Sequence, residues 1–390
     1  MLTTDAYNQI AGADLPSDWC RAELRQTVRS ITRQWHEDRR YEPACDNWMK
    51  GFDLEFTRKL AGSGLLGINW PTQYGGQARS YLDRFAVTEE LLRAGAPVAA
   101  HWMGDRQIGP AILKYGSDSL KQHMLPMIAR GTYSFCLGMS EPESGSDLAS
   151  VRTRAHRVPG GWKIHGSKIW TTNAHQATHC YVLARTRSTD IRHEGLTEFI
   201  VDMNDPAITI RPVIDMNGEH HFNEVFFDGA DSPDEWVIGQ IDNGWRQVTE
   251  QLAFERGGSE RFLTTYPLFA KLLHATSGVQ DRAIQELIAG LVTRLMGIRQ
   301  LSYQFACSVD AGAPALAVAA QVKYLGPEFE RDVVRGARYI TDVLGMRQEL
   351  DALVTSAEAA VTGATIRGGA SDILLGIIAR DELLTGEVAR

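Results

Sequence analysis

The sequence predicts an α+β protein with three parts: an N-terminal helical domain, a middle β-barrel or β-sandwich domain and a C-terminal helical bundle. Apolar residues recur at helical spacing in the first third, short β-branched segments fill the middle, and helical spacing then returns. Because helices and strands are segregated along the chain, a doubly wound dinucleotide-binding fold is disfavoured. The expected boundaries are residues 1–131, 132–240 and 241–390.

The first part is expected to be helical between residues 16 and 130. Its first amphipathic stretch has apolar residues at spacings of three and four, namely Trp19, Leu24, Val28, Ile31 and Trp35. "WPTQYGGQ" is expected to form a loop, and "YLDRFAVTEELLRAGAP" a helix that ends at its glycine and proline.

The middle part contains about seven short segments rich in β-branched and aromatic residues, separated by turn residues. "VPGG" predicts a hairpin turn. After "DNGW" the helical spacing predicts a bundle built from residues 245–265, 281–310, 313–344 and 372–384.

Composition narrows the class of protein. Hydrophobic residues make up 44% and charged residues 23% of the 390 residues, and the formal net charge is −8. An acidic surface argues against nucleic acid as a main partner. Five scattered cysteines without C-x-x-C, no secretory signal and no membrane-spanning run predict a cytoplasmic location.

The candidate metal ligands have unsuitable spacing. His175 and His179 lie in a strand–turn region without a third ligand, and Glu141, Glu143 and Asp147 do not alternate as calcium ligands do. No metal is therefore predicted. The stretch "SEPESGSD" is more simply a surface turn than a ligand loop.

Two other stretches have alternative interpretations. In "WTTN", Trp170 could stack on a planar ligand, although a core position is commoner. In "TIRGGASDILLGIIAR", the helix start at Ser371 or Asp372 could attract an anion or could simply be a capped helix.

Glu255 interrupts an apolar helical face. Val248, Leu252, Ser259 and Phe262 share that face by spacing, so burial is expected to raise the pKa of the Glu255 carboxyl toward the range of a general base. The equal alternative is a Glu255–Arg256 pair at a helix kink. Gly257 and Gly258 follow, which suggests close approach of a ligand or another backbone.

Together these stretches resemble the acyl-CoA dehydrogenase family. "GMSEPESGSDLAS" is similar to its signature loop, and "WPTQYGGQ", "GSKIWTTNA", "FNEVFFDGA", "LAFERGG" and "TIRGGASDILLGIIAR" follow in the family order. The resemblance extends from about residue 20 to 386, and six motifs in register are highly specific.

The resemblance implies FAD as cofactor. It places Leu137, Met139 and Ser140 against one side of the flavin and Trp170, Thr171 and Thr172 at the other, with Asp372 as a further cofactor contact. Ser146 and Arg256 are expected to face the acyl-CoA. Near the expected base, Gly257, Gly258 and Ser259 suggest space for a branched or ring-bearing acyl group. The segments that in the family clamp the FAD pyrophosphate from a neighbouring subunit have no clear counterpart, which leaves a mixed tetramer open.

The resemblance also implies the reaction. Many members carry their base where this chain has Gly368, whereas one branch carries it in a Glu-Arg pair that matches Glu255-Arg256. Glu255 is thus expected to take the α-proton of an acyl thioester while flavin N5 accepts the β-hydride. The Gly368 N–H is the expected donor to the thioester carbonyl, because the developing enolate needs stabilisation.

The predicted activity is therefore FAD-dependent conversion of an acyl-CoA, or an acyl-carrier-protein thioester, to its 2-enoyl product. An electron-transfer flavoprotein is the expected acceptor, and the expected assembly is a homodimer or homotetramer, or else a mixed tetramer. Two alternatives stay open: an oxygen-using acyl-CoA oxidase or monooxygenase of the same fold, and a partner subunit of a hetero-oligomeric dehydrogenase.

Overall fold

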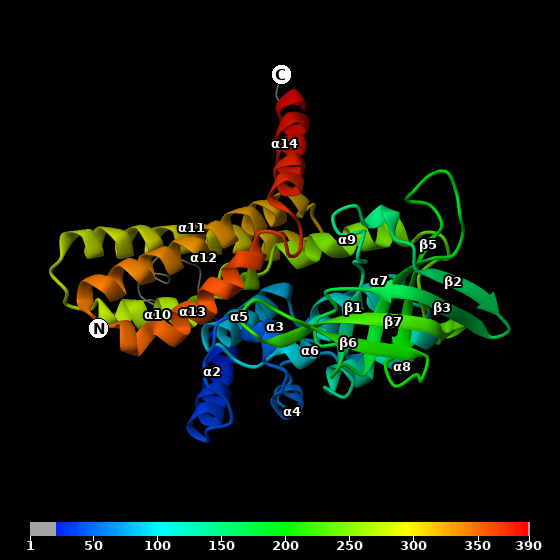
Figure 1. Ribbon diagram of the computed structural model, residues 1–390, viewed down its shortest axis with the longest axis horizontal. Coiled ribbons are helices and arrows are strands. Elements are labelled where there is room, and N and C mark those ends of the chain that lie inside the picture. The colour runs from blue at the N-terminus through cyan, green and yellow to red at the C-terminus, as the bar shows by residue number, and fades with distance from the viewer. Residues whose placement is uncertain (1–20, 389–390) are drawn as a thin grey trace. The chain divides into compact units, whose positions relative to one another are not determined.

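A computed structural model describes residues 21–388, apart from the side chains of residues 252–255, 347–349 and 382–388. Its elements follow the predicted order of helices, strands and helices (Figure 1). The chain forms two compact units built from non-contiguous segments, which are described separately below. Unit 1 combines residues up to 48, 80–96 and 256 onward, and unit 2 combines residues 49–79 and 97–255.

Unit 1 is helical. Its elements are α2 (Ala22–Glu37), α5 (Tyr81–Arg93), the short 3-10 turn η6 (Ser259–Arg261), α10 (Tyr266–Ala275), α11 (Arg282–Asp310), α12 (Leu316–Leu344), α13 (Arg347–Ala364) and α14 (Ser371–Val388).

Unit 2 combines helices with a sheet. Its helical elements are α4 (Leu54–Gly62), η2 (Thr72–Tyr74), α6 (Ala99–Met103), the π-helical turn η3 (Gly104–Ile108), α7 (Gly109–Tyr115), α8 (Asp118–Ala129), η4 (Leu148–Ser150), η5 (Asp234–Trp236) and α9 (Gly244–Arg256), whose last residue is counted in unit 1. The helix α3 (Asn47–Lys50) lies at the boundary in sequence between the two units.

The strands of unit 2 are β1 (Phe135–Gly138), β2 (Arg154–Val158), β3 (Gly161–Lys168), β4 (His179–Arg185), β5 (Leu196–Asp202), β6 (Ile208–Ile214), β7 (His220–Pro233) and β8 (Val237–Ile238). They form one eight-stranded sheet in the order β6-β7-β3-β2-β4-β5-β8, with β1 parallel to β4. The predicted "VPGG" hairpin is confirmed, since Val158 pairs with Gly161 and Gly160 has a left-handed φ of 81°.

The sheet carries apolar residues on both faces where β4 and β5 lie. Cys180, Val182 and Phe199 join one core cluster, whereas Tyr181 and Ile200 join a second cluster with residues of α7 and α8. Because side chains alternate along a strand, burial of both faces explains the nearly unbroken apolar sequence of these strands.

In unit 1 the predicted face of α2 is confirmed, because Leu24, Val28, Ile31 and Trp35 are buried; Trp19 lies outside the described residues. A buried ion network joins α2, α5 and α11. Arg25 lies 2.7 Å from Glu89, and Arg299 also binds that carboxylate. Burial alone would raise the pKa of Glu89, but the guanidinium groups of Arg299 and Arg25 hold it well below its usual range.

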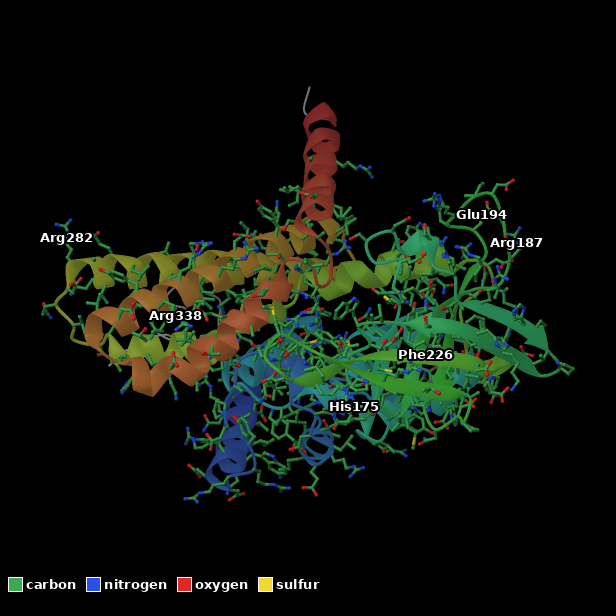
Figure 2. The ribbon with its side chains drawn as sticks, in the orientation of Figure 1. His175, Arg187, Glu194, Phe226, Arg282 and Arg338 are labelled. Carbon is green, nitrogen blue, oxygen red and sulfur yellow. The ribbon has the colours of Figure 1, made fainter. Side chains whose placement is uncertain are left out.

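The predicted helices 281–310 and 313–344 are present as α11 and α12, which lie side by side (Figure 1). Asp281 begins α11 by accepting a hydrogen bond from the Ile284 N–H at 3.0 Å. Arg338 of α12, labelled in Figure 2, pairs with Glu358 of α13 at 2.7 Å.

The predicted helix over residues 245–265 is wrong in its second half. The helix α9 ends at Arg256, so Ser259 and Phe262 do not share its face. A Cβ atom on residue 257 would lie 2.4 Å from the Phe305 ring of α11. Gly257 therefore admits a packed aromatic ring, and the space expected there for a substrate is filled by the protein itself.

Among the described residues, no helix combines enough length with enough apolar character to cross a bilayer.

Candidate active site

The signature turn is built around a buried ion pair in unit 2. Glu141 Oε1 accepts hydrogen bonds from Lys168 Nζ at 2.8 Å and from the Thr153 N–H at 2.9 Å, and Oε2 accepts the Arg152 N–H at 2.6 Å. Burial would raise the pKa of Glu141, but Lys168 and the N–H donors lower it. Lys168 also donates to the Met139 carbonyl at 3.0 Å, so the pair fixes the backbone on both sides of Ser140.

The other acids of this turn point outward. Glu143 pairs with Arg152 at 2.8 Å, and Asp147 pairs with Arg192 at 3.2 Å. These contacts give each acid a protein cation as partner within the folded turn.

One group of possible metal ligands is present among the described residues, formed by Asp215, Glu219 and His221. The Lys50 ammonium binds Glu219 and lies 3.9 Å from Asp215, so a cationic side chain already contacts both carboxylates of this cluster. His175, labelled in Figure 2, stacks on His220 with ring centres 4.1 Å apart, and we assign no metal to either histidine.

Trp170 stands out on the surface of unit 2. Its side chain is 56% exposed and contacts the Phe222 ring edge to face, and its backbone has a φ of 59°. A left-handed backbone is costly for a bulky residue and is tolerated where function needs it. The neighbouring Ile169 N–H donates to the Ser140 carbonyl at 2.9 Å, so this stretch lies beside the signature turn.

Four other predicted flavin contacts, Leu137, Met139, Ser140 and Thr172, are half-buried, so each retains accessible surface near this junction. Ser146 is exposed. Thr171 differs, because its side chain is completely buried and its N–H and carbonyl both bond to Asn223. The backbone of Thr171 therefore stabilises the turn through Asn223. Its hydroxyl group is buried and does not lie on the surface that carries Trp170.

Glu255 is the last residue but one of α9, and its side chain lies outside the described residues. The next residue, Arg256, is buried in unit 1 and donates from Nε to the Gly368 carbonyl at 3.2 Å. This contact lies within unit 1, between the residue that follows Glu255 in sequence and the loop that holds the predicted oxyanion donor.

The loop around Gly368 is positioned from several sides within unit 1. Lys323 Nζ donates to the Ala364 carbonyl at 2.8 Å, and Arg367 forms a bidentate pair with Asp46 at 3.0 and 3.1 Å. Gly368 has a left-handed φ of 75°, and its N–H has no acceptor among the described residues. A fixed loop with a free N–H suits the stabilisation of a developing oxyanion. Asp372 is exposed in the first turn of α14.

Comparison with known proteins shows the class to which this fold and site belong. Three acyl-CoA dehydrogenase models match the chain: the N-terminal domain at residues 21–132, the middle domain at 136–230 and the C-terminal domain at 242–383.

Individual proteins that are similar to this chain are named as acyl-CoA dehydrogenases. "Acyl-CoA dehydrogenase IpdE1" of Mycolicibacterium smegmatis is 36% identical over 274 residues, which cover 66% of this chain and 69% of that protein. The mitochondrial isovaleryl-CoA dehydrogenase of Pongo abelii is 29% identical over 74% of this chain and 72% of its own length. The solved structure of the "Tcur3481-Tcur3483 steroid ACAD" superposes with a TM-score of 0.82 at 25% identity, over 96% of this chain and 98% of that one.

The chain therefore belongs to the acyl-CoA dehydrogenase family, a family of FAD-dependent oxidoreductases, and has its fold of helical N- and C-terminal domains around a central β-domain. The surface beside Ser140 fits a flavin, since it offers an exposed indole on a rigid turn with accessible apolar and hydroxyl side chains nearby.

One residue of this region was missed from sequence. Lys168 is completely buried and connects Met139 to Glu141. A lysine at an inward position of a strand is an unusual signal, because lysine is almost never fully buried without a partner.

Proposed function

We propose that this chain catalyses the FAD-dependent α,β-dehydrogenation of an acyl-CoA thioester, with Glu255 as the base. The observation that carries the proposal is the continuity of Glu255, Arg256 and the Gly368 loop. Glu255 directly precedes Arg256, the last residue of α9. The Arg256 side chain bonds to the loop, and that loop presents an N–H without an acceptor among the described residues.

The protein residues have separate tasks. Glu255 would take the α-proton of the thioester, and the Gly368 N–H would donate to the thioester carbonyl. That donation is needed because an α-proton is too weakly acidic for a carboxylate unless the enolate charge is stabilised as it forms. Arg256 positions the loop through the Gly368 carbonyl. We retain it as a candidate contact for the acyl-CoA, with Ser146 as the second.

FAD would be held by the residues of the predicted flavin surface and by the start of α14, namely Leu137, Met139, Ser140, Trp170, Thr172 and Asp372. When bound, FAD supplies the acceptor for the hydrogen that leaves the β-carbon. Trp170 would orient the flavin by stacking, and the Glu141–Lys168 pair would keep the signature turn rigid beside it.

The test is anaerobic reduction of the purified flavoprotein by a panel of acyl-CoA thioesters, followed by loss of the visible flavin band. Glu255→Gln should lower the reductive rate by about 10²–10⁴-fold, the usual contribution of a positioned base. Glu235→Gln, at an exposed residue of η5, is the matched control and should keep the rate.

A Glu255→Gln protein that binds flavin and reduces it at a near-normal rate would remove Glu255 from this role. Adding oxygen or an electron-transfer flavoprotein to the reduced protein then identifies the acceptor. We propose the electron-transfer flavoprotein, and rapid oxygen consumption would favour an oxidase instead.

We further propose that the chain functions as an oligomer. Large apolar side chains are exposed on α12 and α14 of unit 1, including Leu325, Tyr339, Val343, Ile373 and Leu375. Apolar side chains left exposed on helices favour a contact with another protein chain. Similar structures include the ChsE4-ChsE5 complex of Mycobacterium tuberculosis, at 25% identity and a TM-score of 0.80, so a mixed tetramer is a specific alternative. Light scattering on the chain alone distinguishes these assemblies.

A further inference from the structure

Unit 2 contains a cavity of about 300 Å³. Asn69 and Trp70 form one wall, the π-helical turn η3 and α7 a second, and Glu250 and Gln251 of α9 a third. The wall at η3 includes Gln107. A π-helical turn is rare and is often found at functional sites, because it displaces side chains from regular helical positions.

Arg106 also lines this cavity, and its guanidinium lies over the Trp102 ring, 5.1 Å from the ring centre. Four neutral side chains of the lining carry buried polar atoms without a hydrogen-bond partner among the described residues. Two are donors, Trp70 Nε1 and Gln107 Nε2, and two are acceptors, Asn69 Oδ1 and Gln251 Oε1. Trp70 is completely buried, and Gln107 and Gln251 are each 5% exposed. Such atoms are unfavourable unless something else satisfies them, and here they are gathered around one space.

The amide of Gln251 is held in one orientation. Its Nε2 lies 2.9 and 3.0 Å from the two carboxyl oxygens of Glu198, which is completely buried on β5. Because the amide nitrogen is engaged there, Oε1 is the atom of Gln251 that is left for a ligand. Glu198 is therefore a positioning residue that acts through Gln251.

The opposite wall is equally rigid. A Cβ atom on residue 109 would lie 2.0 Å from the Trp70 ring, so the indole fits closely over Gly109 at the start of α7. At the rim, Lys114 and Tyr115 both bind the Glu250 carboxylate. The rest of the lining includes Pro110, Ala111 and Leu113, which makes the cavity mainly apolar with a few fixed polar groups.

We propose that this cavity binds a hydroxyl-bearing, otherwise apolar part of the substrate acyl group, with Trp70, Gln107, Asn69 and Gln251 supplying its hydrogen bonds. The proposal rests on the proposed function, since it names a class of acyl group for that reaction. It makes Gln107 and Gln251 specificity-determining residues of this chain.

The chemistry of the lining selects the neutral hydroxyl. A hydroxyl group both donates and accepts, so it matches a site that has donors and acceptors. A carboxylate would face two acceptor oxygens and the Glu250 carboxylate. Of the two cations in the lining, Lys114 is already paired with Glu250, and the Arg106 guanidinium lies over the Trp102 ring. A plain alkyl chain would displace water from the cavity and would leave all four polar atoms without hydrogen-bond partners.

The spacing between Gln251 and Glu255 on α9 determines how far the expected hydroxyl lies from the reacting carbon. Gln251 precedes Glu255 by four residues, which corresponds to about 6 Å along a helix axis. If Glu255 meets the α-carbon, the hydroxyl belongs several bonds further along the acyl group.

A matched pair of probes tests this, namely 3-(4-hydroxycyclohexyl)propanoyl-CoA and 3-cyclohexylpropanoyl-CoA, which differ only in the hydroxyl group. With the flavin-loaded protein, the hydroxylated probe should show a kcat/KM about 10-fold to 100-fold higher. Calorimetric binding without turnover should show the same preference.

In Gln107→Leu and in Gln251→Leu the ratio of the two kcat/KM values should fall to within about 2-fold, because leucine keeps the volume and removes the hydrogen bond. Gln122→Leu, at an exposed residue of α8, is the same change outside the cavity and should keep the ratio. Thermal unfolding of each variant checks that it is folded.

The outcomes separate the two proposals. If neither probe bleaches the flavin and no other acyl-CoA does, the proposed function fails. If both probes are oxidised equally well by the unmodified protein, or if its preference survives both leucine variants, the dehydrogenase stands and the hydroxyl site is overturned. A crystal structure with the hydroxylated probe bound and only water in the cavity would also overturn it.

Discussion

Two buried glutamates of unit 2 have opposite electrostatic settings. Glu141 lies in the signature turn with the Lys168 ammonium at 2.8 Å and two backbone N–H donors, and its pKa is lowered. Glu198 lies on β5 with the Gln251 amide as its hydrogen-bonded neighbour, and burial raises the pKa of its carboxyl to about 8.

The difference shows what each carboxyl group contributes. Glu141 is an ionised anchor, and its charge organises the backbone around the predicted flavin surface. Glu198 is mainly protonated at neutral pH, and it orients a neutral amide at the wall of a cavity without bringing a charge to it. The same residue type thus fixes a turn through its charge in one region and orients a neutral amide in another.

The largest expected effect comes from breaking the charged anchor. Glu141→Gln leaves the Lys168 ammonium completely buried without its carboxylate, so the free energy of unfolding should fall by about 3–5 kcal/mol. Urea unfolding followed by circular dichroism measures this loss.

Glu141→Gln combined with Lys168→Met serves as the control, because it removes both charges. It should be less destabilised than Glu141→Gln alone. A loss below about 1 kcal/mol in the single variant would show that the pair does not organise the turn.

The next largest effect is a change in the free energy of unfolding with pH. The pKa of Glu198 is raised from 4.5 to about 8 on folding, so the folded state binds more protons than the unfolded state between those values. Stability from this group is complete below about pH 4.5 and is lost as the pH rises toward 8, by about 1.4 kcal/mol per pH unit at most. Urea unfolding at pH 5.5, 6.5 and 7.5 measures the slope.

Glu198→Gln should make that slope shallower, because glutamine does not titrate. Glu330 in unit 1 also has its pKa raised by burial to about 8, so the wild type and the variant must be compared by difference. Identical slopes in both proteins would mean that Glu198 does not titrate in this range.

The smallest effect is expected at the surface of the same turn. Glu143 and Arg152 have side chains that are 71% and 79% exposed, so their ion pair is screened by water. Glu143→Gln should change the free energy of unfolding by less than about 1 kcal/mol. A loss as large as that of Glu141→Gln would contradict the contrast between an anchored and a solvated acid.

Much of the fold was predictable because local spacing determines it. The apolar face of α2, the starts and ends of α11 and α12, and the β2–β3 hairpin all follow from residues near one another in sequence. The end of α9 was not predictable in this way. It depends on the close packing of Gly257 beneath Phe305, a residue far along the chain.

The candidate site likewise contains residues that the sequence could identify and residues that it could not. Trp170, Glu255 and the signature turn were selected from contiguous motifs, and their roles remain predictions. Lys168 and the cavity residues could not be selected, because Asn69, Gln107, Glu198 and Gln251 come together only through tertiary packing. None of them lies in a recognisable spacing pattern.

The left-handed backbone of Trp170 has a consequence for protein engineering. Such a conformation costs roughly 1–2 kcal/mol in residues with a Cβ atom, and glycine avoids that cost. Trp170→Gly should therefore make the flavin-free protein more heat-resistant while it removes the surface on which a flavin would stack. A thermostability screen run without cofactor would enrich variants that have lost this surface, so directed evolution of this enzyme should keep FAD in the selection medium.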